Sequence, residues 1–495
     1  MEVTPQNKDT LDYQLRYVIR DGIATQIMVT LTSGIFLVAF ALELGASIAL
    51  IGFIAAIPPL AQLLQIPGIY LIEKYQKKRS ICSITSLFGR SIWLLIAFIP
   101  FLLLNDFGLF ILILLLIVNG SMGAIGNLSW NSWMREIIPQ EKLGSFFSKR
   151  MSYSIGFGLV VSLFAGLFID YWKYTFPNIS IIGYSILFFI GFIIGMIGIY
   201  FISKIPEFHS KRKIEKIMLV ELLKKPFANH NFKNLLIFMG TWNFAINLAA
   251  PFFTVYMLIR LQLDMSYIIM LTVISQLMNI IFLRYWGKFS DKYSNKTILG
   301  ICSPLFILCI LGWTFTTLPE KYFFTMPLLI ILHILMGISM AGVTLASGNI
   351  GLKLAPKGEA TSFLATNRII NSIAAGIAPI IGGYFIDYFS QREFSIMLNW
   401  SDPQGIIIFD TLNFQGWDFF FFSAFLLGIY AIHRLAYVVE IGEVDEKIVI
   451  HELISEIKSS MRTVSTIGGL FNIVQFPFSV ITQRKRKKSH KKNRT

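Results

Sequence analysis

The sequence predicts an all-α membrane protein in which twelve transmembrane helices form two pseudo-symmetric six-helix bundles. The prediction rests on twelve long apolar runs, an internal repeat that relates the two halves, and a strong clustering of positive charge. The chain has 495 residues, of which 55% are apolar and 14% are charged, and its mean hydropathy is +0.65. Because soluble domains carry about a quarter charged residues, this composition indicates a protein embedded in lipid.

The apolar runs are predicted to be helices. About 20 apolar residues span the ~30 Å hydrocarbon core of a bilayer, and backbone groups in lipid must be satisfied within a helix or a closed barrel. The alternating pattern of barrel strands is absent from the sequence. The twelve runs cover roughly residues 23–44, 47–72, 81–104, 107–133, 146–170, 179–203, 234–259, 265–286, 297–318, 323–351, 362–387 and 416–438.

One span of each half repeats the other. Residues 145–171 read SFFSKRMSYSIGFGLVVSLFAGLFIDY, and residues 362–388, at a shift of 217, read SFLATNRIINSIAAGIAPIIGGYFIDY. Both copies end in Gly-x-Phe-Ile-Asp-Tyr, and the same shift carries Pro139 onto Pro356. A constant offset indicates duplication, and repeats in the same orientation are a common plan of secondary transporters, with the site between the halves.

The net charge of +15 follows membrane topology. If the N-terminus is cytoplasmic, nearly all of the 43 Lys and Arg residues fall on the cytoplasmic side, and the opposite side has only Lys173, Arg260, Lys321 and Arg392. This bias predicts that both termini are cytoplasmic, in a multi-pass protein of a bacterial inner or plasma membrane. It also argues against nucleic acid as a partner, because no folded binding module surrounds the basic tail.

The segments between the spans complete the predicted organisation. The acidic residues before residue 22 argue against a cleaved signal peptide. The external loop 390–415 is expected to be a disordered connection; the alternative is that Trp400 and Phe409 cap the outer mouth. The predicted units are a cytoplasmic arm (1–22), a first bundle (23–203), a central loop that acts as a tether (204–233), a second bundle (234–438) and an amphipathic and polybasic tail (439–495).

A charged motif occurs in the loop that follows the predicted helix 265–286. It reads Gly287-Lys-Phe-Ser-Asp291-Lys292-Tyr-Ser-Asn-Lys296. This resembles the loop signature of the major facilitator superfamily, roughly Gly-x-x-x-Asp-[Arg/Lys]-x-Gly-[Arg/Lys]-[Arg/Lys], which that family carries once in each half. Two copies at the repeat distance, twelve spans and a long central loop together make the resemblance strong over residues 23–438.

The first copy of the motif lies 218 positions earlier and departs from the signature. Glu73 replaces the aspartate before Lys74, and Gly68 stands one residue early. The resemblance implies that the acidic residues pair with cationic or helix-end partners and lock an outward-open state. The alternative is that these are loop charges that only set topology. The expected gating residues of the two copies are Glu73, Lys74, Gly287, Asp291 and Lys292.

The end of the predicted fourth helix, Trp133-Met-Arg135-Glu136-Ile-Ile-Pro139, resembles the Trp-x-x-[Asp/Glu]-x-x-Pro ending of many bacterial facilitator permeases of unassigned substrate. Arg135 and Glu136 are therefore further gating candidates, as partners for the charges of the second-to-third helix loop. The alternative is an ordinary surface pair.

The sequence contains no recognisable motif for catalysis. There is no Gly-x-x-x-x-Gly-Lys-[Ser/Thr] motif for a nucleotide and no nucleophile elbow. The three cysteines Cys82, Cys302 and Cys309 form neither a disulfide framework nor a metal cluster with histidines. We expect no enzyme activity, no catalytic residue, no metal and no cofactor.

Ionisable groups at mid-membrane depth are costly and suggest function. His333 and Arg90 are predicted at such depth. In the resembled fold helices 1, 4, 7 and 10 line the cavity, so His333 in helix 10 is a candidate for substrate contact or proton transfer. The alternative is a histidine that donates to a backbone carbonyl. Arg90 is a further candidate, and its alternative is a brace for the first bundle through carbonyls or Glu73.

Amide and indole side chains supply the other substrate-binding candidates. Asn243 and Asn247 lie four residues apart on one helix face, and the repeat shift carries them onto Gln26 and Thr30. For each of these residues the alternative is a hydrogen bond between helices. The candidates are Asn243, Asn247, Gln26, Asn127 and Trp130.

The tail combines helical periodicity over residues 444–461 with the basic run 484–492. Such a segment is predicted to bind anionic lipids of the inner leaflet, and the alternative is a solvated, disordered tail.

We therefore predict a monomeric secondary active or facilitative transporter that moves a small polar solute, neutral or anionic, by rocker-switch alternating access. No carboxylate is predicted at mid-depth, which disfavours a cationic solute and leaves His333 as the only carrier for a coupled proton. The alternatives are a proton-coupled efflux pump for drugs or metabolites and a non-transporting receptor or scaffold.

Overall fold

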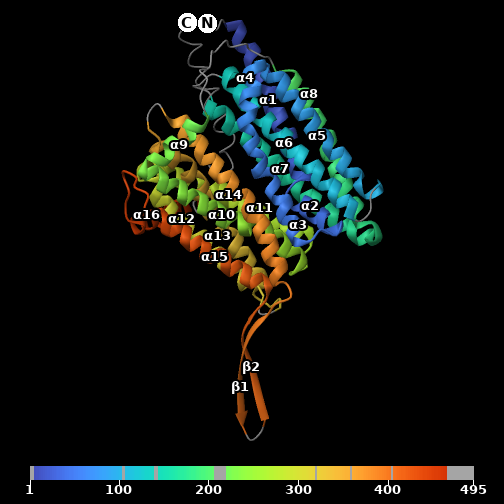
Figure 1. The fold of residues 1–495 in the computed structure, drawn as a ribbon, viewed down its shortest axis with the longest axis vertical. Coiled ribbons are helices and arrows are strands. Elements are labelled where there is room, and N and C mark those ends of the chain that lie inside the picture. The colour runs from blue at the N-terminus through green and yellow to red at the C-terminus, as the bar shows by residue number, and fades with distance from the viewer. Residues whose placement is uncertain are drawn as a thin grey trace.

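The computed structural model describes residues 5–102, 106–138, 143–205, 219–317, 320–356, 359–402 and 405–464. Within these ranges twelve helical segments are long and apolar enough to cross a membrane. They are arranged in two groups that follow one another along the chain (Figure 1). The predicted fold class, a helical membrane protein of twelve spans, is confirmed.

The first group contains the first six spans, and two of these spans are interrupted. Span one breaks at Gly34, whose φ of +61° favours glycine, and span two passes through a short 3₁₀ turn directly after Pro58 and Pro59. The elements are α1 (Pro5–Thr32), α2 (Ile35–Glu43), α3 (Ile48–Ala61), η1 (Gln62–Leu64), α4 (Gln65–Tyr75), α5 (Lys78–Leu102), α6 (Asp106–Ile137), α7 (Leu143–Thr175), η3 (Pro177–Ile179) and α8 (Ser180–Ser203).

The second group contains the other six spans and two flanking helices. Side-chain caps mark the starts of two of its helices, because Asn229 accepts the Phe232 N–H and Ser294 accepts the Thr297 N–H. The elements are α9 (Leu219–Ala228), α10 (His230–Ile259), α11 (Met265–Lys292), α12 (Asn295–Thr314), α13 (Thr325–Leu354), α14 (Ala360–Phe389), α15 (Gly416–Leu435) and α16 (Glu446–Val464).

The first helix differs from the expected arm. α1 continues through the boundary expected at residue 22, and the first span begins at Leu15. Asp21 therefore lies inside a membrane-length helix, and only 2% of its surface is exposed. The polar residues Arg16 and Arg20 on the exposed side of α1 gave the appearance of a surface arm.

The loop expected to be a disordered connection instead forms an antiparallel hairpin of β1 (Phe394–Asp402) and β2 (Gly405–Phe414). The hairpin extends away from the helices, at the end opposite to α4 and α9 (Figure 1). The backbone of Leu398 pairs with Phe409, and Trp400 pairs with Ile407. Both residues proposed to cap the outer mouth thus belong to an arm that points away from the bundles.

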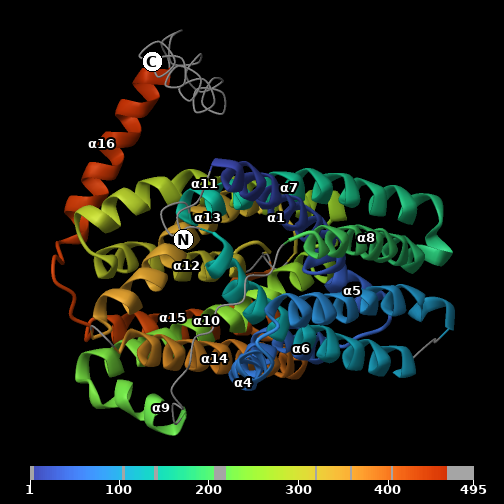
Figure 2. The same cartoon turned by 90° about the horizontal axis from the view of Figure 1, so that it is seen from above.

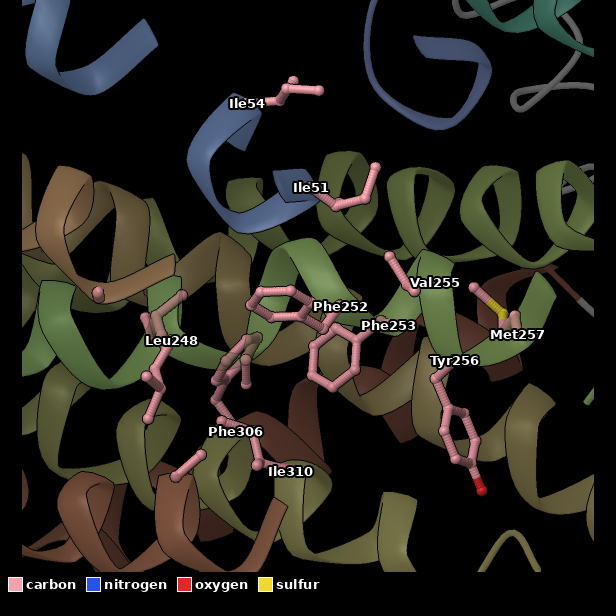
Figure 3. Close-up of a cluster of buried hydrophobic side chains, with 14 of the residues drawn as sticks. Ile51, Ile54, Leu248, Phe252, Phe253, Val255, Tyr256, Met257, Phe306 and Ile310 are labelled. Atoms are coloured by element: carbon pink, nitrogen blue, oxygen red, sulfur yellow. The ribbon is translucent and has the colours of Figure 1, made fainter. Parts of the chain in front are cut away.

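The two bundles contact each other through α3 with α14, α7 with α11, and α2 and α3 with α10. At the hairpin end this contact is apolar: the buried Ile51 lies on the side of α3 that faces α10 and Phe252, and Ile54 is buried on the other side of the same turn (Figure 3). A Cβ on Gly52 would lie 3.2 Å from Phe252 Cζ and would overlap the carbonyl oxygen of Pro379 on α14. Gly52 therefore allows α3 and α14 to approach closely.

We predict that the hairpin can be removed without loss of the fold. Because Phe394 and Phe414 face each other at its base, with Cα atoms about 5 Å apart, two glycines can replace residues 395–413. The stability of a protein depends only weakly on the length of a surface connection, by about 0.6 kcal/mol per doubling of its length. Thermal unfolding of the purified shortened protein should match that of the full chain, and loss of folded protein would contradict this view of the hairpin.

Candidate functional site

Asp170 on α7 joins the two bundles at the hairpin end. Its carboxylate accepts two backbone hydrogen bonds from the start of α11, with Oδ1 2.8 Å from Met265 N and Oδ2 2.8 Å from Ser266 N. The first N–H groups of a helix have no partner within the helix, and they carry partial positive charge that favours a carboxylate. Asp170 thus caps a helix that belongs to the other bundle.

Asp387, the repeat partner of Asp170, does the same in the opposite direction. Its Oδ2 lies 2.9 Å from the backbone N of Ala49, at the start of α3. The second bundle therefore caps a helix of the first one. We call the two contacts, Asp170 with Met265 and Ser266, and Asp387 with Ala49, the outer clamps.

The glycines of the repeated motif bring the helices close enough for these hydrogen bonds. A Cβ on Gly166 would lie 2.6 Å from Ile269 Cδ1 and 3.2 Å from Ser266 Cα. A Cβ on Gly383 would lie 2.7 Å from Ala49 Cα. The repeated Gly-x-Phe-Ile-Asp-Tyr contains both aspartates and was a signal for a shared contact, but nothing local in the sequence identifies their partners.

The gating motif at the other end of α11 has no comparable contact. A Cβ on Gly287 would meet no atom within 4 Å. Asp291 is exposed, and no hydrogen bond or ion pair joins its side chain to another described residue. Lys292 bonds Glu452 of α16, with Nζ 2.6 Å from Oε1, and so contacts its own half of the chain. α7 and α11 therefore meet at the hairpin end, while at the other end the described residues of this motif make no hydrogen bond or ion pair with the first bundle.

The first copy of the motif lies at the end of α4. Lys74 is exposed beside Tyr75, and the side chain of Glu73 lies outside what the structure describes. Of the two candidates at the end of α6, Glu136 contacts Lys78 at the start of α5, and Arg135 is exposed. The Lys78–Glu136 pair joins helices of the same bundle.

The segment after α15 docks on the start of α12 through Glu440. Its carboxylate, 4% exposed, accepts from Asn295 Nδ2 at 2.9 Å and from the Lys296 backbone N at 2.7 Å, and it pairs with Lys353 Nζ at 2.9 Å. Burial alone would raise the pKa of Glu440, but these donors together hold that pKa below its ordinary value. The described part of the tail is thus fixed to the motif-bearing loop.

α16 continues this contact and then projects beyond the edge of the second bundle (Figure 2). Lys288 and Lys296 bond Glu456 and Glu443 at 2.6 and 2.8 Å. On α16, Ile448 and Ile454 remain exposed. The expected amphipathic helix is present, and the basic run 484–492 lies outside the described residues.

Arg90 is held inside the first bundle. Its guanidinium lies 2.7 Å from Gly195 O on α8, 2.9 Å from Thr25 Oγ1 and 3.2 Å from Asp21 Oδ1 on α1. Arg90 is 7% exposed. This arrangement matches the brace expected as the alternative to substrate contact, but its carboxylate is Asp21 rather than Glu73.

His333 is also held by its own bundle. Its Nδ1 lies 2.8 Å from Leu329 O, one turn earlier on α13, and its ring packs edge-on against Trp313 of α12, with centroids 5.6 Å apart. It is 7% exposed. This placement argues against substrate contact, because the ring faces α12 and the bonded nitrogen faces a backbone carbonyl.

The amide candidates remain partly open. Asn243 and Asn247 on α10 each donate to the carbonyl one turn earlier, at 2.8 Å, and each keeps its side-chain oxygen free of a hydrogen bond to any described residue. Gln26 lies between its own Thr30 and Gly158 of α7. Asn127 is exposed and accepts from Asn131.

Trp130 belongs to a polar group that the sequence did not indicate. The Arg150 guanidinium of α7 lies over its ring, with Cζ 4.5 Å from the centroid. Trp130 Nε1 is buried and has no acceptor among the described residues. Arg150 had been counted only as a topology-setting charge.

We predict that the Asp21–Arg90 pair behaves as a buried ion pair. Arg90→Met alone would leave the Asp21 carboxylate unpaired and should cost about 3–5 kcal/mol of stability. The double variant Asp21→Leu/Arg90→Met should lose much less, because both charges are removed together. Thermal unfolding measures the stability of both variants, with Ser91→Ala, at a partly exposed position of α5, as the control. Equal losses in the single and double variants would contradict the pairing.

We predict a pH dependence of tail docking. A carboxyl whose pKa is lowered on docking stabilises the docked state above the pKa of the free group, about 4.3, and the stabilisation is lost as pH falls through the lowered value. Hydrogen exchange of residues 436–458 should therefore be slow at neutral pH and rise in acid. Glu440→Gln should flatten this profile, whereas Glu443→Gln, an exposed partner, should preserve it.

Comparison with known proteins places these features in a family. The Major Facilitator Superfamily model matches residues 22–379, and no curated protein matches the chain. A variant of the nucleoside transporter NupG superposes with a TM-score of 0.64 at 14% identity, covering 87% of this chain and 100% of that one. A peptide-bound POT family transporter superposes with a TM-score of 0.58 at 11% identity, and the match covers 87% of this chain and 96% of that one.

A bacterial homologue of the human lysosomal transporter Spinster, in an inward-facing and unoccupied conformation, gives a TM-score of 0.53 at 12% identity and covers 88% of this chain and 95% of that one. At such identities the solved structures establish the fold alone. The family match extends over more than half of the chain, and it agrees with the twelve spans. This chain belongs to the Major Facilitator Superfamily and is a multi-pass membrane transporter.

Proposed function

We propose that the protein moves a small polar solute, neutral or anionic, by rocker-switch alternating access. The observation that carries this proposal is the pair of outer clamps. Repeat-related aspartates join the bundles at one end. At the other end the described residues of the Gly287 motif contact only their own half of the chain, and a Cβ on Gly287 would meet no atom within 4 Å. Contacts that are closed at one end and open at the other are what alternating access requires of one of its two end states.

The described conformation is then the inward-facing state. The positive-inside bias puts the loop motifs and both termini in the cytoplasm, and the clamps on the outer side. Opening outward would release the hydrogen bonds of Asp170 and Asp387. It would bring α11 against the first bundle near Gly287, where Asp291 could cap a helix end or pair with a cationic side chain of that bundle. The motif would thus lock the outward-open state, as the family resemblance implies.

The solute site is proposed between the bundles, at the partly open amides. Asn243 and Asn247 on α10 and Gln26 on α1 would supply acceptors and donors, with Asn127 and Trp130 from α6. Amides and an indole suit neutral or anionic groups, because they add no negative charge to hold a cation. His333 and Arg90 are left out, since their hydrogen bonds lie within single bundles.

Proton-coupled efflux is the second candidate function, and Asp21 is the observation that favours it. A buried carboxylate on α1 provides a titratable group that the sequence did not place within the membrane. Its pairing with Arg90 would have to open during the cycle. A transport rate that is independent of a proton gradient would exclude this coupling.

The remaining proposals concern the surroundings of the protein. We propose a monomer in a bacterial inner or plasma membrane, with exposed Ile448 and Ile454 of α16 and the basic tail at an anionic inner leaflet. Counterflow of metabolite pools by the purified protein in liposomes tests transport itself. A receptor or scaffold that retained the fold would bind ligand without any counterflow.

We predict that the outer clamps hold the outer side closed. Loss of a helix cap costs about 1 kcal/mol, so Asp170→Ala/Asp387→Ala should shift the population outward by about tenfold or more. Spin labels at Tyr174 and Phe323, both highly exposed, should report a longer distance between the outer ends. Each single variant should give part of this shift.

The matched control for this prediction is Glu43→Gln. Glu43 is an acidic residue at the same end, but it bonds Lys173 and Ser180 of its own bundle. Its variant should leave the label distances unchanged. An unchanged distance in the double aspartate variant would remove the clamps from the transport cycle.

A further inference from the structure

We propose that Arg150 binds an anionic group, a carboxylate or a phosphate, of the transported solute. The proposal rests on the transport function proposed above and narrows its solute class from neutral or anionic to anionic. Arg150 lies on α7 and faces α1 and α6. Its Nε is 3.3 Å from Val18 O, its guanidinium covers the Trp130 ring, and Gly22 leaves the space that the guanidinium fills.

The other charges inside this bundle neutralise each other. Asp21 accepts from Arg90 and from Thr25 Oγ1, each at 3.2 Å. Arg90 also donates to Gly195 O and Thr25 Oγ1. The guanidinium of Arg150 is therefore the excess positive charge of this polar group.

The donors of Arg150 are mostly unused. A guanidinium has five N–H donors in a planar fork, and the bond to Val18 O uses one of them. Its Nη groups have no hydrogen-bond partner among the described residues, and neither has the adjacent Trp130 Nε1. Carboxylate and phosphate match this fork in a bidentate way, so an anion would supply the missing acceptors.

The position of Arg150 connects it to the proposed solute site. Arg150, Ser154 and Gly158 are spaced four residues apart and share one face of α7. A Cβ on Gly158 would lie 3.1 Å from Gln26 Cγ on α1, and Ser154 Oγ is buried without a partner in the described chain. Arg150 itself is only partly buried. The anion-binding fork thus adjoins the amide lining on the same helix pair.

Thermal unfolding of the purified protein tests the proposal with three probes: succinate, its neutral isostere succinamide, and inorganic phosphate, at matched ionic strength. Either succinate or phosphate should stabilise the protein, and succinamide should not. The anion that stabilises the protein identifies the site as a carboxylate site or a phosphate site. Arg150→Gln should lower the affinity for the stabilising anion about tenfold or more, because hydrogen bonds to charged groups contribute that much to binding. Arg150→Lys should show an intermediate loss. Lys149→Gln, an exposed neighbour with the same charge change, should stay within about twofold.

A second measurement on the unmodified protein keeps the test independent of variant folding. Phenylglyoxal should modify Arg150, and the stabilising anion should protect it, whereas the buried Arg90 should react slowly in both cases. Stabilisation by succinamide alone, absence of stabilisation by either anion, or equal anion binding by Arg150→Gln would overturn the site. The spin-label distances at the outer clamps do not depend on Arg150. If they change as predicted while no anion binds, the anion site is wrong and the proposed alternating access is not.

Discussion

The start of a transmembrane helix exposes N–H groups that its own backbone cannot satisfy, and lipid offers them no water. In this protein two of these helix starts are satisfied from across the bundle interface. Asp170 bonds the start of α11 and Asp387 bonds the start of α3. The N–H groups of these two helix starts thus find their acceptors in the other half of the chain. The resulting contacts hold the two halves together at the hairpin end of the interface.

Duplication makes this solution symmetric. In each half a carboxylate ends one span, and a glycine lies four residues earlier. Each carboxylate bonds the start of the second span of the other half. Gly166 admits Ser266 and Gly383 admits Ala49 to close range. Each capped span carries a loop motif at its opposite end, on α11 in the second half and on α4, which continues α3, in the first half. In the proposed cycle each of these two spans therefore has one end for each state. In the proposed cycle a rigid rotation would exchange the two contacts without repacking the bundles.

The spans could be predicted from the sequence because hydropathy is a local property, and the repeat was visible as identity at a fixed shift. Asp21 was misplaced because its neighbours along the chain are charged, while its partner Arg90 lies 69 residues away. The hairpin was missed although its second strand is rich in isoleucine and phenylalanine, a pattern that favours strands. Partners distant in sequence, such as Glu440 and Asn295, leave no local signal.

Depth in the membrane was an incomplete criterion for function. His333 and Arg90 lie deep, yet their hydrogen bonds end on Leu329, Gly195 and Asp21, so each is held within a single bundle. Arg150 looked like one of many cytoplasmic charges, yet its fork is largely unbonded within the described chain. The unused donors of a guanidinium match the oxygens of a carboxylate or a phosphate. A fold that positions Trp130 and Gly22 around such a cation is therefore best explained by an anion that arrives and leaves with each transport cycle.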